Sequence, residues 1–454
     1  MKKFLKTLLI IFLGLLVLGV ILIEKIDRTP YQKTAHFQQW KQEVVNHDWT
    51  VDSIQEPLLA GWGMVNMTPD ESVPMAGYGA RWGKHYKTIH DSVYVRAIGL
   101  QDQANKKLFF VSADLLIIPP NVKQRLIPLL EKSGIALDNV HFGATHTHTS
   151  IGGWGQKLIG SLFAGKYDEN VEIHLATKMH EAILLAMKDM KPTQIRYWEK
   201  RFENGVKNRL KVEGAELKDD KIRGLHFLRN DSTEALFLTY TAHTTLLRHS
   251  DLELTRDFPG FLVDSLETME NVDFSMYMAG AVGSMSSNVK GEGPYMAAKN
   301  LADSLYTHTE TVYQNLQEEA PLDKAFYSSS ITVPFPPSNA RISINYALRP
   351  WVFASLFGAS PAYIKVTHLG DVLILGMPAD FSGEIMLELE EYAKQKGLHL
   401  IVTSFNGEYM GYITSDKWYE YNLYETTTMS WYGYQAASYI TQASKDIMDA
   451  LSPN

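Results

Sequence analysis

The segment Asn139-Val140-His141-Phe142-Gly143-Ala144-Thr145-His146-Thr147-His148-Thr149-Ser150 passes from an apolar run into a His-Thr-His triplet. The apolar run predicts a strand, and residues two apart in a strand point to the same face. We therefore expect the imidazoles of His146 and His148 to project side by side from the end of that strand. Paired imidazoles on a rigid support, next to the flexible Gly152-Gly153 loop, are typical of a zinc site with room for water and substrate. A hydrogen-bonded or surface histidine pair is the alternative, so other ligands must come from elsewhere in the chain.

The composition restricts both the class of protein and the kind of metal site. The 454 residues are 45% hydrophobic and 21% charged, which is typical of a globular protein with one large core or two packed domains. The chain has no cysteine, so disulfides and thiolate ligands are excluded. A metal must then be held by histidine, carboxylate, tyrosine or water. The formal net charge of −8 disfavours binding to nucleic acid.

The N-terminus has the pattern of a membrane anchor. Lysines occur at positions 2, 3 and 6, before an unbroken apolar run over residues 8–23. With Phe4 and Leu5 the segment is just long enough to span a bilayer, and the lysines place its amino end in the cytoplasm. A cleaved signal peptide is the alternative, but no small-residue cleavage site follows the apolar run. We predict an uncleaved, single-pass transmembrane signal anchor over residues 1–28, with the domain of residues 29–454 extracytoplasmic.

Strand-like and helix-like segments alternate along the rest of the chain. Apolar runs and period-two patterns predict strands at 92–100, 108–113, 194–198, 224–228, 235–241, 274–279 and 400–405, and a hairpin at 363–377. Helical periodicity and end signals predict helices at 31–47, 120–134, 169–190, 258–266, 296–316, 380–395 and 432–451, with Asp380 as an N-cap. Without repeats or a low-complexity linker, this order predicts an α/β fold of mixed β-sheets flanked by helices, in a single catalytic domain behind the N-terminal transmembrane helix.

Polar residues collect at the ends of the predicted strands, where the sites of α/β sheets form. They are the His-Thr-His triplet, His243, Ser286, Asp380 and Tyr412. Each has an ordinary structural alternative: His243 as a hydrogen-bonded core residue, Asp380 as a cap, Tyr412 as packing and Ser286 as part of a turn.

The order of several motifs resembles that of the neutral/alkaline ceramidases. The matching strings are Met75-Ala76-Gly77-Tyr78-Gly79, Val111-Ser112-Ala113-Asp114-Leu115, Gly143-Ala144-Thr145-His146-Thr147-His148, Asn208-Arg209, Thr241-Ala242-His243-Thr244, Asp257-Phe258-Pro259-Gly260 and Gly411-Tyr412-Ile413-Thr414. They cover nearly all of the chain after the anchor. The resemblance implies a zinc amidase that hydrolyses ceramide to sphingosine and a fatty acid.

The same resemblance implies a role for eight residues. Those implied to hold Zn²⁺ are His146, His243, Asp380 and Tyr412. Those that fall on further active-site positions are His148, Arg209 and Tyr424, and Ser286 falls on the position of a proposed serine nucleophile. We expect water to be the attacking group, because a metal site needs no serine nucleophile and no aspartate lies beside Ser286 in the sequence.

Departures from the family pattern leave two other functions open. Asp380 replaces a glutamate, and Ser284 and Ser287 replace an aspartate and a proline beside the proposed nucleophile. One alternative is a dinuclear amidohydrolase barrel, which also places His-x-His at a strand end and would bind two metals. The other is a non-catalytic, membrane-anchored zinc-binding relative. For an enzyme, the anchor favours a lipid-like amide substrate over short acyl or peptidic amides.

Overall fold

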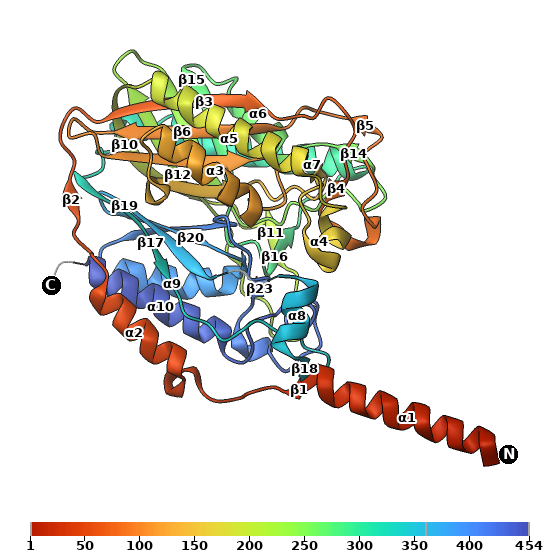
Figure 1. The fold of residues 1–454 in the computed structure, drawn as a ribbon. Coiled ribbons are helices and arrows are strands. Elements are labelled where there is room, and N and C mark those ends of the chain that lie inside the picture. Colours follow the sequence, from red (N-terminus) through yellow and green to blue (C-terminus); the bar gives the residue numbers. More distant parts are fainter. Residues whose placement is uncertain (1, 359–360, 453–454) are drawn as a thin grey trace.

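The computed structural model describes residues 2–358 and 361–452, and two large sheets stacked face to face form its centre (Figure 1). The larger sheet has the strand order β15-β13-β12-β10-β3-β6-β7-β8, and the smaller has the order β2-β17-β19-β20-β22. The strands of the larger sheet are β3 (Leu59–Asn66), β6 (Tyr94–Gln101), β7 (Lys107–Ala113), β8 (Val140–Ala144), β10 (Lys191–Arg201), β12 (Lys221–Arg229), β13 (Glu234–Tyr240) and β15 (Val272–Ala279). Those of the smaller are β2 (Asp52–Ser53), β17 (Ala325–Thr332), β19 (Tyr363–Leu369), β20 (Val372–Met377) and β22 (His399–Ser404).

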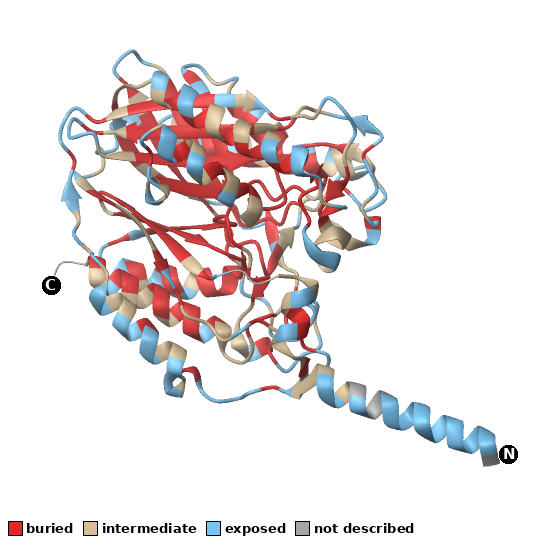
Figure 2. Cartoon of the chain, viewed as in Figure 1, coloured by how far each residue is buried: buried red, intermediate tan, exposed pale blue. Residues whose placement is uncertain are grey.

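Apolar side chains between the two sheets hold them together. Phe110 and Phe237 of the larger sheet belong to the same buried cluster as Ile374 and Ile401 of the smaller, and all four are 0% exposed. Burying one such side chain contributes roughly 1.5–3 kcal/mol. Figure 2 shows the buried residues concentrated in the facing sheets and on the inner sides of the helices. The sheets are open and stacked over the described residues, so the alternative of an amidohydrolase barrel was wrong.

Helices cover the outer face of each sheet and complete a four-layer arrangement (Figure 1). On the larger sheet lie α3 (Pro120–Lys132), α5 (Glu169–Lys188), α6 (Asp257–Leu266) and α7 (Pro294–Tyr313). On the smaller lie α9 (Gly383–Gln395) and α10 (Ala436–Leu451), with α2 (Ala35–Asn46) packed on α10. Glycines in β3 permit the closest of these contacts, because a Cβ on Gly61 would lie 2.0 Å from the carbonyl oxygen of Ala186 in α5. The predicted α/β fold of mixed sheets flanked by helices is confirmed.

The remaining elements of the described residues are short. The helices are α4 (Lys157–Ala164) and α8 (Pro350–Leu356), together with the 3₁₀ turns η1 (Tyr31–Lys33), η2 (Gly79–Arg81), η3 (Leu137–Asn139), η4 (Leu316–Glu318) and η5 (Asp416–Trp418). The two-stranded pairs are β4 (Met75–Ala76) with β9 (Ser150–Ile151), β5 (Thr88–Ile89) with β14 (Glu253–Leu254), β11 (Val206–Asn208) with β16 (Met285–Ser287), and β21 (Asp380–Phe381) with β23 (Tyr412–Ile413).

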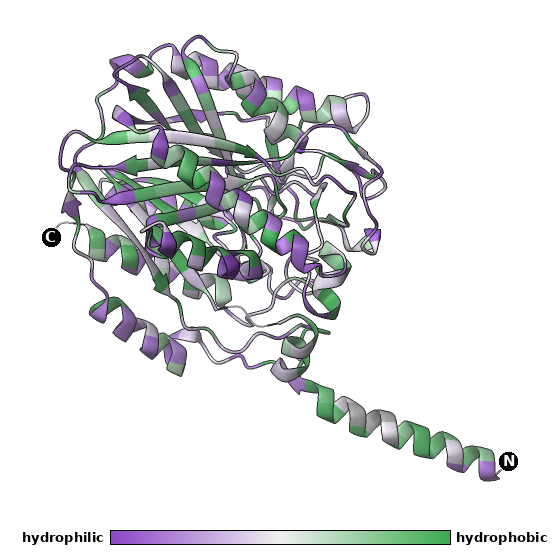
Figure 3. Ribbon diagram, turned by 45° about the horizontal axis from the view of Figure 1, so that its top comes forward, coloured by the Kyte–Doolittle hydropathy of each residue, from purple (hydrophilic) through white to green (hydrophobic). Residues whose placement is uncertain are grey.

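The N-terminal helix α1 (Lys2–Leu22) extends away from this body, and its hydrophobic residues colour it largely green in Figure 3. Residues Lys3–Leu22 are long and apolar enough to cross a membrane, although a signal sequence meets the same criteria. The helix passes directly into β1 (Ile23–Lys25), which pairs in antiparallel fashion with β18 (Tyr346–Leu348).

Two local predictions were wrong. Strand β8 ends at Ala144, so His146 and His148 lie in the loop beyond the strand, and His146 has a left-handed backbone with φ 61°. The N-cap of α9 is Ser382, whose hydroxyl accepts a hydrogen bond from the backbone N–H of Glu384 at 3.2 Å, and Asp380 is in β21 instead. The carboxylate of Asp380 is therefore free of a capping role.

Candidate metal centre

The candidate centre lies where three parallel strand pairs end. The pairs β7–β8, β13–β15 and β20–β22 are parallel, and their carboxyl ends meet at one edge of the stacked sheets. The loop after β8 contains His146 and His148, the loop after β13 contains His243, and Asp380 follows β20. Loops at the carboxyl ends of parallel strands are where α/β proteins form their sites, so the fold brings together side chains that are far apart in sequence.

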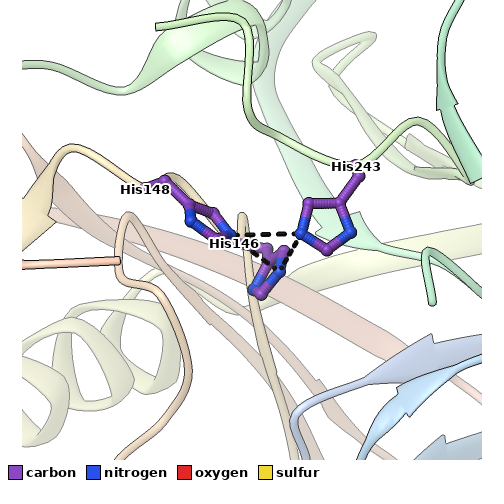
Figure 4. Close-up of side chains that lie close together, drawn as sticks. All are labelled: His146, His148 and His243. Carbon is purple, nitrogen blue, oxygen red and sulfur yellow. Dashed lines mark hydrogen bonds between the residues drawn. The ribbon is translucent and has the colours of Figure 1, made fainter. Parts of the chain in front are cut away.

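Three imidazoles converge at this edge (Figure 4). The Nε2 atoms of His146 and His243 are 3.0 Å apart, and the Nε2 atom of His148 lies 3.2 Å from the first and 3.1 Å from the second. In a tetrahedral zinc site with bonds of about 2.1 Å, nitrogen ligands lie roughly 3.4 Å from one another. The three nitrogens could therefore hold one metal ion.

Neighbouring groups orient each ring. The Nδ1 atom of His146 lies 2.6 Å from the carbonyl oxygen of Leu116, so Nδ1–H donates there and the lone pair of Nε2 points into the site. Its ring stacks on Phe405, with centroids 4.2 Å apart. The ring of His148 packs beside that of Tyr78. The Nδ1 atom of His243 lies 3.3 Å from the carbonyl oxygen of Val282, which can accept a hydrogen bond from Nδ1–H and so leave Nε2 free to face the site.

The imidazoles of His148 and His243 are neutral in this environment. Burial, and then the neighbouring His146, hold the pKa of each well below its usual range. The neutral ring is the form that binds a metal. Both rings are therefore in the protonation state that a metal ion requires.

Asp380 supplies a carboxylate to the same point. Its Oδ1 atom lies 3.2 Å from Nε2 of His146, is buried and accepts no hydrogen bond within the described residues. Its Oδ2 atom accepts a hydrogen bond of 2.7 Å from the hydroxyl of Tyr409. A buried carboxylate oxygen without a donor is costly unless it faces a cation. Together with the three ring nitrogens, this orphaned oxygen gives a donor set that fits a divalent metal.

Two tyrosines and an arginine lie around these groups. Tyr412 is paired with Asp380 in the β21–β23 register, and its ring lies nearly parallel to that of His243, with centroids 6.3 Å apart. The ring of Tyr424 meets that of Tyr412 edge-on at 5.7 Å, and burial raises the pKa of Tyr424 to about 12. The guanidinium of Arg209 forms an ion pair with Glu425 at 2.8 Å, and its Nη1 atom lies 3.1 Å from Nδ1 of His243.

Ser286 lies outside this group. It is in β16, opposite Lys207 of β11, and it is not among the residues that line the cavity described below. No hydrogen bond within the described residues involves its hydroxyl. Ser284 is buried, and its hydroxyl pairs with that of Ser382 at 2.8 Å.

A largely apolar cavity of about 230 Å³ opens onto the candidate centre. His146, His148, Asp380, Tyr409, Tyr412 and Tyr424 line its polar end. Its walls include Leu116, Ile117, Trp154, Phe163, Phe353, Phe357, Met429 and Trp431. An apolar channel that ends at a few convergent polar groups is the usual form of a small-molecule site, and here it suits a substrate with a hydrocarbon chain.

Some contributors to the site were not predicted from the sequence. Tyr409 and Phe405 flank the predicted strand end, where aromatic residues would ordinarily be packing. Leu116 orients His146 through its backbone carbonyl, a role for which its side chain gives no signal in the sequence. The pairing of the His148 and His146 imidazoles was predicted from their spacing, and in the structure Nε2 of His148 also lies 3.1 Å from Nε2 of His243.

The sequence and the fold of this chain match known proteins. The family model described as "Neutral/alkaline non-lysosomal ceramidase, N-terminal" matches residues 58–301. The crystal structure of neutral ceramidase from Pseudomonas aeruginosa is similar in fold, with a TM-score of 0.73 and 18% sequence identity over 88% of this chain and 74% of that one. A structure described as "Ceramidase complexed with C2" has a TM-score of 0.71 and 17% identity over 88% of this chain and 75% of that one.

Proposed function

The chain belongs to the neutral/alkaline non-lysosomal ceramidase family, and on that premise we propose that it is a membrane-anchored, zinc-dependent amidase. Its substrate would be the N-acyl amide bond of ceramide-like lipids or related lipid amides. The anchor would be residues 1–28, with the hydrolase domain of residues 29–454 on the extracytoplasmic side. The observation that carries the proposal is the convergence of three ring nitrogens within 3.0–3.2 Å of one another, beside a buried carboxylate oxygen that accepts no hydrogen bond within the described residues.

One group of residues would bind the metal ion, and a second group would orient the substrate. His146, His243, Asp380 and Tyr412 would hold the ion, and Nε2 of His148 lies close enough to add to them. When bound, zinc supplies Lewis acidity toward the amide carbonyl and toward a water molecule. The remaining groups would orient the amide and stabilise the charge that develops on its oxygen.

Arg209 and Tyr424 are the groups best suited to that second task. Burial lowers the pKa of Arg209, but the neighbouring Tyr412, Glu425 and Asp380 outweigh it, so the guanidinium stays charged. The phenol of Tyr424 keeps its proton at neutral pH, because its pKa is about 12, and it can donate a hydrogen bond inside the cavity. His148 would receive or return a proton where it is not engaged by the ion.

Water is the better candidate for the attacking group. The hydroxyl of Ser286 has no base partner within the described residues, and this residue does not line the cavity. A serine nucleophile needs an adjacent base to activate it. Ser286 then has a structural place only, as the partner of Lys207 in the β11–β16 strand pair.

The proposal is tested by metal analysis and turnover on the purified full-length chain. We expect about one zinc per chain, because the three ring nitrogens and the carboxylate oxygen converge on a single point, and hydrolysis of an N-acyl sphingoid lipid that chelator removes and added zinc restores. His146→Ala should lose both the metal and the activity. Stoichiometric zinc without hydrolysis of any N-acyl lipid or simple amide would instead favour the non-catalytic relative.

A further inference from the structure

The N-terminal helix is joined rigidly to the part of the body that forms the cavity mouth. Strand β1 follows α1 without a linker, and its three residues pair with β18. Arg349 reinforces the joint: its backbone N–H donates to the carbonyl oxygen of Leu22 at 2.8 Å, and its guanidinium donates to that of Val20 at 3.2 Å. The same Arg349 is the N-cap of α8, from which Phe353 reaches the cavity wall. The end of α1 and the mouth of the cavity therefore move as one unit.

Exposed apolar side chains surround this joint and the mouth. The set consists of Ile342, Ile344 and Tyr346 in and before β18, Trp351 on α8, Leu158 on α4 and Trp82 after η2. We call these six residues the collar. Each is at least half exposed, and Trp82 reaches 74% with a left-handed backbone at φ 55°. Helix α4 contacts α8 on one side and η2 on the other, and this links the members around the opening.

Large apolar side chains that cluster on a surface mark a contact with something apolar. The length of α1 indicates what that is. At 1.5 Å per residue, the 20 residues of Lys3–Leu22, which are mostly apolar, extend about 30 Å, which is the thickness of a bilayer's hydrocarbon core. Once α1 spans that core, no stalk is left, and β1 with its partner β18 must lie at the level of the lipid headgroups. Tryptophan, tyrosine and isoleucine are side chains that enter this layer readily.

We propose that the collar is a membrane-docking surface, seated in the headgroup layer of the leaflet from which α1 emerges. The cavity mouth then faces the leaflet, and a lipid amide enters from the bilayer without crossing water. The docking rests on the membrane-anchoring part of the proposed function and is independent of its zinc chemistry. A second copy of the chain, packed collar to collar, is the competing occupant.

The absence of cysteine permits a direct test of depth. Single substitutions Ile344→Cys, Trp351→Cys and Leu158→Cys in the full-length chain would be nitroxide-labelled and reconstituted in phosphatidylcholine nanodiscs with one protein per disc. Matched labels at Val45 on α2 and Leu185 on α5 are exposed but lie far from the joint (Figure 1). We expect collar labels to collide with oxygen and to be protected from a water-soluble nickel chelate, and the two controls to show the reverse.

Two results of this measurement would overturn the docking. One is free access of the nickel chelate to all three collar labels. The other is protection that is absent in the single-chain nanodiscs and appears only in a parallel reconstitution in which several chains share a vesicle, with spin–spin broadening that grows with protein density, because this would assign the collar to a second copy.

Activity on two substrates gives a second readout. The double variant Ile342→Asp/Ile344→Asp should lower kcat/KM for a vesicle-embedded N-acyl sphingoid lipid at least tenfold, and leave hydrolysis of a short-chain, water-soluble N-acyl amide unchanged. Leu185→Asp is the matched control and should change neither. Equal activity of the double variant and the wild type on embedded lipid would contradict the docking. If the wild type hydrolyses neither substrate, the proposed chemistry fails, and the label depths still decide the docking.

Discussion

At the scale of single residues, the hydroxyl of Tyr409 orients the carboxylate of Asp380, which is a candidate metal ligand. The phenol donates to one carboxylate oxygen and leaves the other directed at the imidazoles. Tyr409→Phe removes this donor with almost no change in volume. We expect zinc affinity to fall roughly 10- to 100-fold, as is usual when a group that orients a metal ligand is lost, measured by competition with a chromogenic chelator. Tyr419→Phe is the control, because the buried hydroxyl of Tyr419 has no hydrogen-bond partner among residues 2–358 and 361–452, and the zinc affinity of this variant should be unchanged.

Ser286 separates the two possible attacking groups. If water attacks, Ser286→Ala should keep kcat within roughly tenfold of the wild type, since losing a nucleophile costs many orders of magnitude. The measurement is steady-state hydrolysis of an N-acyl lipid, with zinc content confirmed in the same sample. A loss of several orders of magnitude with zinc still bound would establish the serine as part of the chemistry.

The site residues that could be predicted from the sequence are those that directly follow apolar strands. His146, His243 and Asp380 have this position, which predicts that they lie at the carboxyl ends of strands, where α/β sites form. Ser286 was also placed at a strand end and does not line the cavity, so the strand pattern gave the location, and only the resemblance to the ceramidases implied which residues act together. Tyr409 could not be found in this way, because only the tertiary fold brings its hydroxyl to the carboxylate. The N-cap of α9 was misassigned for a local reason: Ser382 lies two residues further on and binds the free N–H of the helix.

At the scale of elements, β19 contains a buried cation with a predictable effect on stability. Burial lowers the pKa of Lys365 from its ordinary value of 10.5 to about 7, against the opposing effect of Asp138, and its ammonium donates to Ser328 at 2.8 Å. Between these two pKa values the unfolded chain binds more protons than the folded one, so stability contributed by this group rises with pH over that window.

Lys365→Met tests this directly. The variant removes the penalty for a buried charge, which is complete below the folded pKa and vanishes above the unfolded one. The Tm of the variant relative to the wild type should therefore be highest near pH 6 and should decline toward pH 10, followed by circular dichroism in detergent. A difference in Tm that does not change with pH would contradict the lowered pKa.

The alternation of strands and helices was correctly predicted from the sequence, but the stacking of the sheets was not. Strands such as β7 and β13 are apolar on both faces, and this pattern shows that each face is covered without showing by what. The cover is a helical layer on one side and the second sheet on the other, and the choice depends on contacts between distant residues.

At the scale of the whole molecule, β1 bears on whether the N-terminal helix is retained. Signal cleavage near the end of α1 would cut within or just before β1, the strand that pairs with β18. It would leave Ile26, which is only 6% exposed, at a new chain end without the strand pairing that precedes it. We expect intact-mass spectrometry of the membrane-purified chain to show that residues 1–25 are present. A mature mass that lacks them would assign α1 to a signal peptide and would also remove the basis of the docking surface.

Because no stalk separates α1 from the body, the position of the cavity mouth at the bilayer also determines how the reaction rate depends on lipid concentration. An enzyme whose entrance is fixed at the bilayer meets its substrate by lateral diffusion in two dimensions, so its velocity follows the mole fraction of lipid amide in the leaflet. Diluting the vesicles at fixed lipid composition would leave the turnover rate of each molecule unchanged, whereas diluting the amide with inert lipid would lower it.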